Sequence, residues 1–174
     1  EEYRNGRILK EELRSKRFRI TFEERGLFDE SLAGQIGEHY MQITPGMNLL
    51  FPNTLETLEY LIANNYALFI LTNGFISTQE KKIRNSGIES YFKRMFSSEE
   101  IGINKPRQEI FHWAVTSVNA PKQQCLMIGD DPGVDIEGAM AYGIDAVLFD
   151  PEGIHRASGR YRSIRDLAEL RAFL

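Results

Sequence analysis

Three aspartates surround the end of a short apolar run. In "CLMIGDDPGVDIEGA" the run ends at Gly129, and Asp130, Asp131 and Asp135 follow it. Crowded carboxylates repel one another unless a cation neutralises them. Mg²⁺ prefers oxygen ligands and typically binds one or two protein carboxylates together with waters and substrate phosphate oxygens. A helix cap would explain one aspartate but not three, so the cluster predicts half of a magnesium site.

Groups suited to holding a phosphate occur elsewhere in the chain. Thr72, Asn73 and Gly74 come directly after "YALFIL", and Lys105 stands before Pro106. A hydroxyl, backbone amides and an ammonium group could together bind the non-bridging oxygens of a phosphate. Each has an ordinary explanation when taken alone, because Asn-Gly is a common turn and most lysines are solvated. Their shared place near strand ends favours a phosphate site.

The elements that position these residues alternate between strands and helices. The predicted strands are "YALFIL", "FKRMFSS", "CLMIG" and "DAVLF". The predicted helices are "PNTLETLEYLIANN", "STQEKKIRNSG", "PRQEIFHWAVTSV" and "DIEGAMAYG". Strands without period-two alternation, separated by helices, predict a parallel sheet that is buried on both faces. Ligands of such sheets bind beyond the carboxyl ends of the strands, so we expect Thr72, Lys105 and Asp130 to converge there.

Two details of the predicted helices can be compared with the structure. Ser77 and Glu80 have the spacing of a capping box, which predicts that their helix begins at Ser77. The helix before "YALFIL" is predicted to be amphipathic, with an apolar side formed by Leu55, Leu58, Leu61 and Ile62. Near the N-terminus, "FRITF" alternates like a strand, but the good helix formers around it favour a helix.

Composition limits the class of protein. The chain has 174 residues, of which 42% are hydrophobic, enough for one domain with a small appendage. A net charge of -4 gives no reason to expect a nucleic acid polymer as partner. The longest apolar run is far too short for a membrane span. Cys125 is the single cysteine, so a reducing, cytoplasmic compartment is the natural interpretation.

The order of these motifs resembles a known family. Leu-Thr-Asn-Gly, then Lys-Pro-x-x-x-Ile-Phe, then Gly-Asp-x-x-x-x-Asp are similar to the second, third and fourth motifs of haloacid dehalogenase-like hydrolases. "TNGF" and a later Gly-Ile-x-x-Tyr-Phe run look most like the bacterial pyrimidine 5′-nucleotidases of that family. The resemblance implies a three-layer Rossmann-like parallel sheet. Residues 1–44 would be part of a helical cap, and residues 45–174 would form the hydrolase core.

The resemblance also implies roles for the residues. Thr72 and Lys105 would be catalytic, and both would bind the phosphate together with Asn73 and Gly74. Asp130 would bind Mg²⁺, Asp135 would support the metal or Lys105, and Asp131 would be a further metal residue or only a helix cap. The implied substrate is a small phosphorylated metabolite, specifically a pyrimidine nucleoside monophosphate, hydrolysed through an aspartyl-phosphate.

One motif of the family is absent. The family's first motif, Asp-x-Asp, supplies the nucleophile at the end of the central strand, and the 174 residues contain no Asp-x-Asp. A sheet without its central strand has two rows of unpaired backbone groups in its interior, which is costly. We therefore expect the central first strand to be missing here, the native chain to begin earlier, and the 174-residue chain to be inactive.

Other classes of protein remain open at this stage. The chain could be a non-catalytic regulatory module that binds phosphate and metal. A phospho-receiver domain also gathers acidic residues, a threonine and a lysine at the end of a parallel sheet, but it places its acidic pair first, whereas Asp130 comes last here. A carbon–halogen hydrolase on the same fold needs no metal, which makes the aspartate cluster harder to explain.

Overall fold

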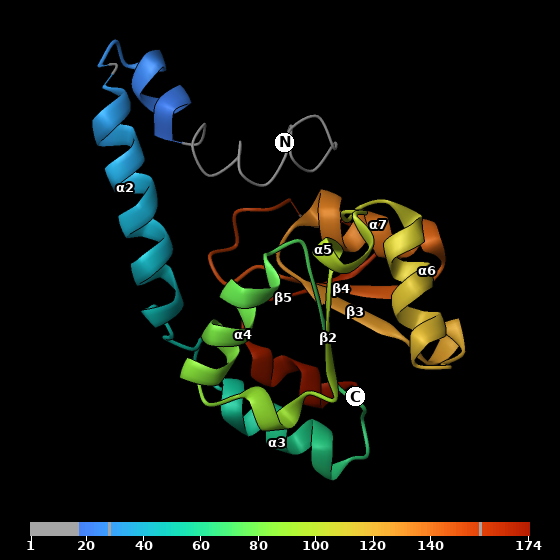
Figure 1. Ribbon diagram of the computed structural model, residues 1–174. Helices are drawn as coiled ribbons and strands as arrows, with labels where there is room; N and C mark the ends of the chain where they lie inside the picture. Colours follow the sequence, from blue (N-terminus) through green and yellow to red (C-terminus); the bar gives the residue numbers. More distant parts are fainter. Residues whose placement is uncertain (1–17, 28, 157) are drawn as a thin grey trace.

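The N-terminal part of the structure is helical. The computed structural model describes residues 18–27, 29–156 and 158–174, so residues 1–17 of the predicted cap lie outside the described residues. Residues 18–24 form a helix, as expected for "FRITF", and α2 (Glu30–Ile43) follows. Asp29 begins α2 by accepting a hydrogen bond from Leu32 N–H at 3.0 Å. The helix α2 forms an arm that stands apart from the strands (Figure 1), and the turn η1 (Thr44–Gly46) follows it.

The strands are all parallel but lie in two separate sheets. β1 (Phe69–Thr72) pairs with β2 (Arg94–Ser97), and β4 (Asp145–Phe149) lies between β3 (Leu126–Gly129) and β5 (Arg162–Ile164). Among the described residues, no strand pairs with β1 on its other edge or with β3 on its other edge. This confirms the predicted α/β class and a parallel core in which the central strand is missing.

The division of the sheet changes how deeply the strands are buried. Every residue of β1 and of β3 is only partly buried, whereas Ala146, Val147 and Leu148 of β4 are buried. The prediction that "YALFIL" and "CLMIG" form fully buried strands is therefore wrong in degree. The difference follows from pairing, because β4 has a neighbour on both edges and β1 and β3 each have only one.

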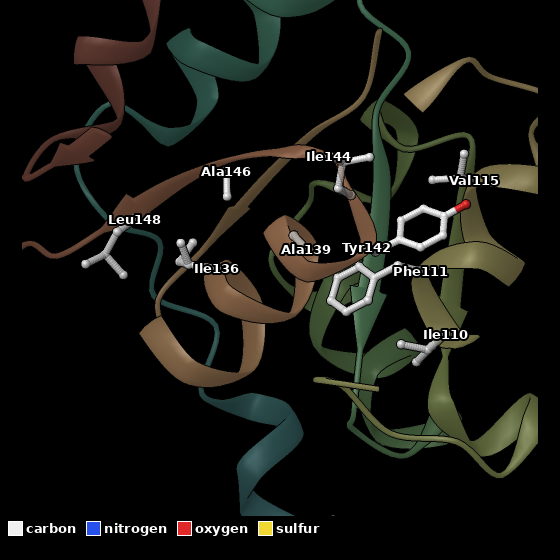
Figure 2. Close-up of a cluster of buried hydrophobic side chains, with 9 residues drawn as sticks. All are labelled: Ile110, Phe111, Val115, Ile136, Ala139, Tyr142, Ile144, Ala146 and Leu148. Carbon is white, nitrogen blue, oxygen red and sulfur yellow. The ribbon is translucent and has the colours of Figure 1, made fainter. Parts of the chain in front are cut away.

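Helices surround the strands and supply most of the core. Their bounds are α3 (Thr54–Ala63), α4 (Ile76–Asn85), η2 (Glu89–Tyr91), α5 (Ser98–Ile101), α6 (Gln108–Ser117), η3 (Lys122–Gln124), η4 (Pro132–Ile136), α7 (Glu137–Tyr142) and η5 (Leu167–Ala172). Figure 2 shows the main cluster, in which Ile110, Phe111 and Val115 of α6 pack with side chains of α7 and β4. Because α6 begins shortly after Lys105 and α7 shortly after Asp135, this cluster fixes the spacing of two candidate site residues.

Two of the predicted helix details are wrong. The helix α4 begins at Ile76, and its first N–H donates to Glu99 Oε2 at 2.8 Å, so its cap comes from α5 and not from Ser77. In α3, Leu61 is buried as expected, but Leu55 and Ile62 are 42% and 43% exposed. Every helix in the described part of the chain is too short or too polar to span a membrane.

Candidate active site

The loop after β1 is closed by its own side chains. The N–H of Gly74 donates to Thr72 Oγ1 at 2.9 Å, and Ser97 Oγ at the end of β2 donates to the Gly74 carbonyl at 2.8 Å. The Thr72 oxygen therefore acts as an acceptor inside the turn. Because a hydroxyl has one proton of its own, Thr72 can still donate a hydrogen bond to an anion beyond the strand end.

Asn73 contacts Lys105 at two points. Its Oδ1 accepts a hydrogen bond from Lys105 N–H at 2.8 Å, and its Nδ2 donates to the Lys105 carbonyl at 3.0 Å. The side-chain amide therefore occupies both backbone groups of a single residue that lies 32 positions later in the sequence. The contact attaches the segment before α6 to the end of β1, as the convergence of strand ends predicted.

Lys105 is buried and forms an ion pair. The residue is only 7% exposed. Its Nζ donates hydrogen bonds to the Leu71 carbonyl and to Asp135 Oδ1, each at 2.7 Å. Asp135 is 5% exposed, and its Oδ2 also accepts from Asp131 N–H at 3.2 Å. A buried charge requires a partner, so the solvated-lysine explanation is wrong. The pair joins the end of β1 to the turn after β3.

The three aspartates have three different environments. Asp131 caps the turn η4, because its Oδ1 accepts hydrogen bonds from Gly133 N–H and Val134 N–H, each at 3.0 Å. Asp135 is buried against Lys105. Asp130 is exposed, and its carboxylate makes no hydrogen bond or ion pair within the described part of the chain. The cluster seen in the sequence is thus divided among a cap, a counter-charge and one outward-facing carboxylate.

Two glycines permit these close approaches, and the sequence analysis missed both. A Cβ on Gly129 would collide with the Asp135 side chain, 2.6 Å from its Cγ. A Cβ on Gly138 in α7 would lie 2.9 Å from both Pro106 Cβ and Phe111 Cε2. A glycine that ends an apolar strand often marks a close approach, and that signal was present in "CLMIG". The contact at Gly138 had no comparable signal.

The described residues can supply part of a magnesium site. Within the described ranges, no group of three or more His, Cys, Asp or Glu side chains is placed to hold a metal ion. Asp135 is occupied by Lys105 and by the backbone of Asp131. Asp130 alone faces outward at the strand end, and one carboxylate with waters and phosphate oxygens is an ordinary Mg²⁺ environment. The residues therefore fit one protein ligand of such a site.

A further buried carboxylate follows β4 and was not predicted as functional. Asp150 is 5% exposed, and its carboxylate accepts hydrogen bonds from Ile154 N–H at 3.1 Å and His155 N–H at 3.0 Å. Burial by itself raises the pKa of Asp150, but the N–H donors and the His155 charge together lower the pKa below its usual value. Asp150 therefore holds the loop after β4 as an ionised cap.

The fold and the strand-end residues define a class of protein. The parallel α/β core places a buried lysine–aspartate pair, a threonine and an exposed aspartate at or just beyond its strand ends. The chain belongs to the haloacid dehalogenase-like hydrolase family, whose sequence model matches residues 20–149. The resemblance noted in the motifs is thereby confirmed at the level of the family.

Individual relatives support the same assignment. The magnesium-bound crystal structure of the HAD-hydrolase YfnB from Bacillus subtilis superposes with a TM-score of 0.87 at 26% identity, covering 99% of this chain and 75% of that one. The pyrimidine 5′-nucleotidase YjjG of Escherichia coli K12 is 28% identical over 88% of this chain and 69% of its own. A phosphoserine phosphatase of Thermus thermophilus is 30% identical over 79% of this chain and 54% of its own. In sequence, the match spans 63% of YfnB.

Proposed function

We propose that this chain forms the core of a Mg²⁺-dependent phosphomonoesterase. The observation that carries the proposal is the buried Lys105, whose ammonium group donates to the carbonyl of Leu71, next to Thr72, and to Asp135 in the turn that follows Asp130. An ammonium group has three N–H donors, and two of them go to Leu71 and Asp135. Within the described residues the third has no acceptor, so it can donate to a phosphate oxygen. Thr72 would donate to a second oxygen of the same phosphate.

The remaining roles follow from exposure and charge. Asp130 would be a ligand of Mg²⁺, which would neutralise charge on the phosphate when bound. Asp135 would hold Lys105 in place, and Asp131 would serve as a cap. Gly74 N–H is used by Thr72, so we assign Gly74 to the shape of the phosphate loop. We propose the same division of the chain as before, in which residues 1–44 form a partial cap and residues 45–174 form the core.

The nucleophile would lie outside the 174 residues. We place it on an upstream strand that ends in Asp-x-Asp and fits between β1 and β3, each of which has an unpaired edge among the described residues. On this proposal the first aspartate attacks phosphorus, the ester P–O bond breaks, and the alcohol leaves with a proton from the second aspartate. Water then hydrolyses the aspartyl-phosphate to inorganic phosphate and the free carboxylate. A non-catalytic regulatory module with the same residues is the alternative, and it predicts phosphate binding without turnover.

For the substrate we favour pyrimidine nucleoside monophosphates. Two observations support this choice: the "TNGF" motif, and the similarity to YjjG, which is a pyrimidine 5′-nucleotidase. Phosphoserine is the second candidate because the Thermus thermophilus relative carries that name. A cytoplasmic location rests on the single cysteine, Cys125.

The test compares two lengths of chain. Phosphate release from p-nitrophenyl phosphate, uridine monophosphate and phosphoserine would be measured with the 174-residue chain and with a chain extended upstream through Asp-x-Asp. We expect turnover only from the extended chain, its loss on addition of EDTA, and a preference for uridine monophosphate. Lys105→Met should lower turnover by at least about a hundredfold, as for other removed charge-stabilising donors. Equal turnover by the 174-residue chain would contradict the proposal.

A further inference from the structure

The side chain of Asn73 is directed at Lys105 and not at the space beyond the strand end. Its two polar atoms each make one hydrogen bond, Oδ1 with Lys105 N–H and Nδ2 with the Lys105 carbonyl. Both backbone groups of Lys105 are thus occupied by a single amide. The Nδ2 group keeps a second N–H, but the two contacts fix the plane of the amide against the Lys105 backbone.

We propose that Asn73 is a positioning residue, which sets the location of the Lys105 ammonium group by holding its backbone. The proposal rests on the proposed function only in assigning Lys105 a role toward phosphate. Its physical content is independent of catalysis: removing the amide should release Lys105 from its two acceptors. This gives Asn73 the role of supporting the residue that would contact the phosphate.

The geometry supports this role because both the backbone and the ammonium group of Lys105 are hydrogen-bonded to the end of the β1 segment. The Asn73 amide holds the backbone of Lys105, and the Leu71 carbonyl, two positions earlier on the same strand segment, accepts from Nζ at 2.7 Å. The third attachment is Asp135 on the side of β3. A lysine side chain is long and has many rotamers, so fixing its backbone and its ammonium group together selects one of them. The result is a brace between the two sheets.

The chemistry of position 73 makes the proposal specific. An aspartate there would keep an acceptor for Lys105 N–H but would place a second carboxylate oxygen against the Lys105 carbonyl. Two acceptors facing each other repel and leave a part-buried carbonyl without its donor. Asparagine offers an acceptor oxygen and a donor nitrogen side by side on a rigid planar group, which matches the N–H donor and the carbonyl acceptor of the Lys105 backbone.

The test measures hydrogen exchange of the Lys105 ammonium group in the 174-residue chain. Lysine would be labelled with ¹⁵N, and the Lys105 signal would be assigned from its absence in Lys105→Arg. We expect Asn73→Asp and the milder Asn73→Ala to speed this exchange by about tenfold, because the ammonium group loses its fixed acceptors. The matched control is Asn85→Asp, which changes another asparagine whose Nδ2 donates to a backbone carbonyl, that of Pro45, at 2.8 Å in a part-buried hydrogen bond. It should leave the Lys105 signal unchanged.

The outcomes are separable from those of the phosphatase test. Unchanged ammonium exchange in both Asn73 variants would overturn the proposal and leave the proposed function untouched. Loss of the cooperative thermal transition in both Asn73 variants, with Asn85→Asp still folded, would also overturn it, because the contact would then hold the fold as a whole. Failure of the extended chain to release phosphate would remove the proposed function and leave the positioning of Lys105 by Asn73 in place.

Discussion

At the scale of the residue, the environment of each aspartate decides what it can do. Asp130 and Asp135 are five positions apart and chemically identical, yet one is exposed and the other is 5% exposed against Lys105. Asp135→Asn should lower the free energy of unfolding by about 3–5 kcal/mol, because it leaves a buried lysine without its counter-charge. Asp130→Asn is the matched control and should change stability by less than about 0.5 kcal/mol. Urea unfolding followed by circular dichroism would measure both, and equal effects would contradict this division.

Asp150 gives a prediction about acid stability. Because its folded-state pKa is lowered, its ionised form is favoured in the folded state, and its contribution is present above its usual pKa. That contribution is lost as the pH falls through the lowered value. Unfolding free energies measured between about pH 6 and pH 3 should therefore decline less steeply in Asp150→Asn than in the parent chain.

The control for this prediction is Asp145→Asn. Asp145 is exposed at the start of β4, the strand that precedes Asp150. Its replacement should therefore leave the dependence of the unfolding free energy on pH as it is in the parent chain. An acid slope in Asp150→Asn that superimposes on that of the parent would show that the loop cap does not contribute to stability.

The sequence predicted these residues better than it predicted their partners. Thr72, Lys105 and the aspartates could be chosen because their types and their places after strands are local properties. That Asn73 holds Lys105, and that the Leu71 carbonyl accepts from the same lysine, depends on contacts across 32 and 34 positions. A particular backbone carbonyl cannot be identified as an acceptor from the sequence, because every residue has one.

At the scale of the element, the turn from β3 into η4 depends on Gly129, which has no side chain. Gly129→Ala would place a methyl group against Asp135, and overpacking of this kind costs about 1–3 kcal/mol. The melting temperature should fall accordingly. Gly34→Ala in α2 is the contrasting change, because a Cβ there meets nothing within 4 Å. Replacing that helical glycine should stabilise the chain by about 0.5–1 kcal/mol. The same sign for both changes would contradict the role of Gly129.

The elements themselves were predictable where their signal is local. The apolar segments predicted the strands, and the helix predicted for "PRQEIFHWAVTSV" contains α6 (Gln108–Ser117). The start of α4 was not predictable, because Ser77 and Glu80 have capping-box spacing but the cap is Glu99 from α5. A tertiary acceptor replaced a local one, and its identity depends on how α5 packs beside the loop after β1.

At the scale of the whole molecule, the two sheets are not paired with each other in the described part of the chain, and the side chain of Lys105 connects them. Lys93 N–H donates to the Leu68 carbonyl at 2.9 Å, so Leu68, Ile70 and Thr72 direct their backbone groups toward β2. Alternate residues of a parallel strand face opposite neighbours, which leaves Phe69 and Leu71 facing the other edge. The Leu71 carbonyl accepts a hydrogen bond from Lys105 Nζ, which agrees with Leu71 facing away from β2. The brace of Lys105 and Asp135 thus spans the edge where a strand would lie.

Hydrogen exchange of the backbone amides tests this arrangement. In the 174-residue chain, the amides of Phe69 and Leu71 should exchange at least about tenfold faster than those of Ile70 and Thr72, because they lack a neighbouring strand. In β4, which has strands on both sides, Val147 and Leu148 should both be protected. Protection of Phe69 and Leu71 equal to that of β4 would show that the edge is already covered. In the upstream-extended chain their exchange should slow, because a central strand would then pair with β1 and bring its Asp-x-Asp to the end of the sheet where Lys105 is held.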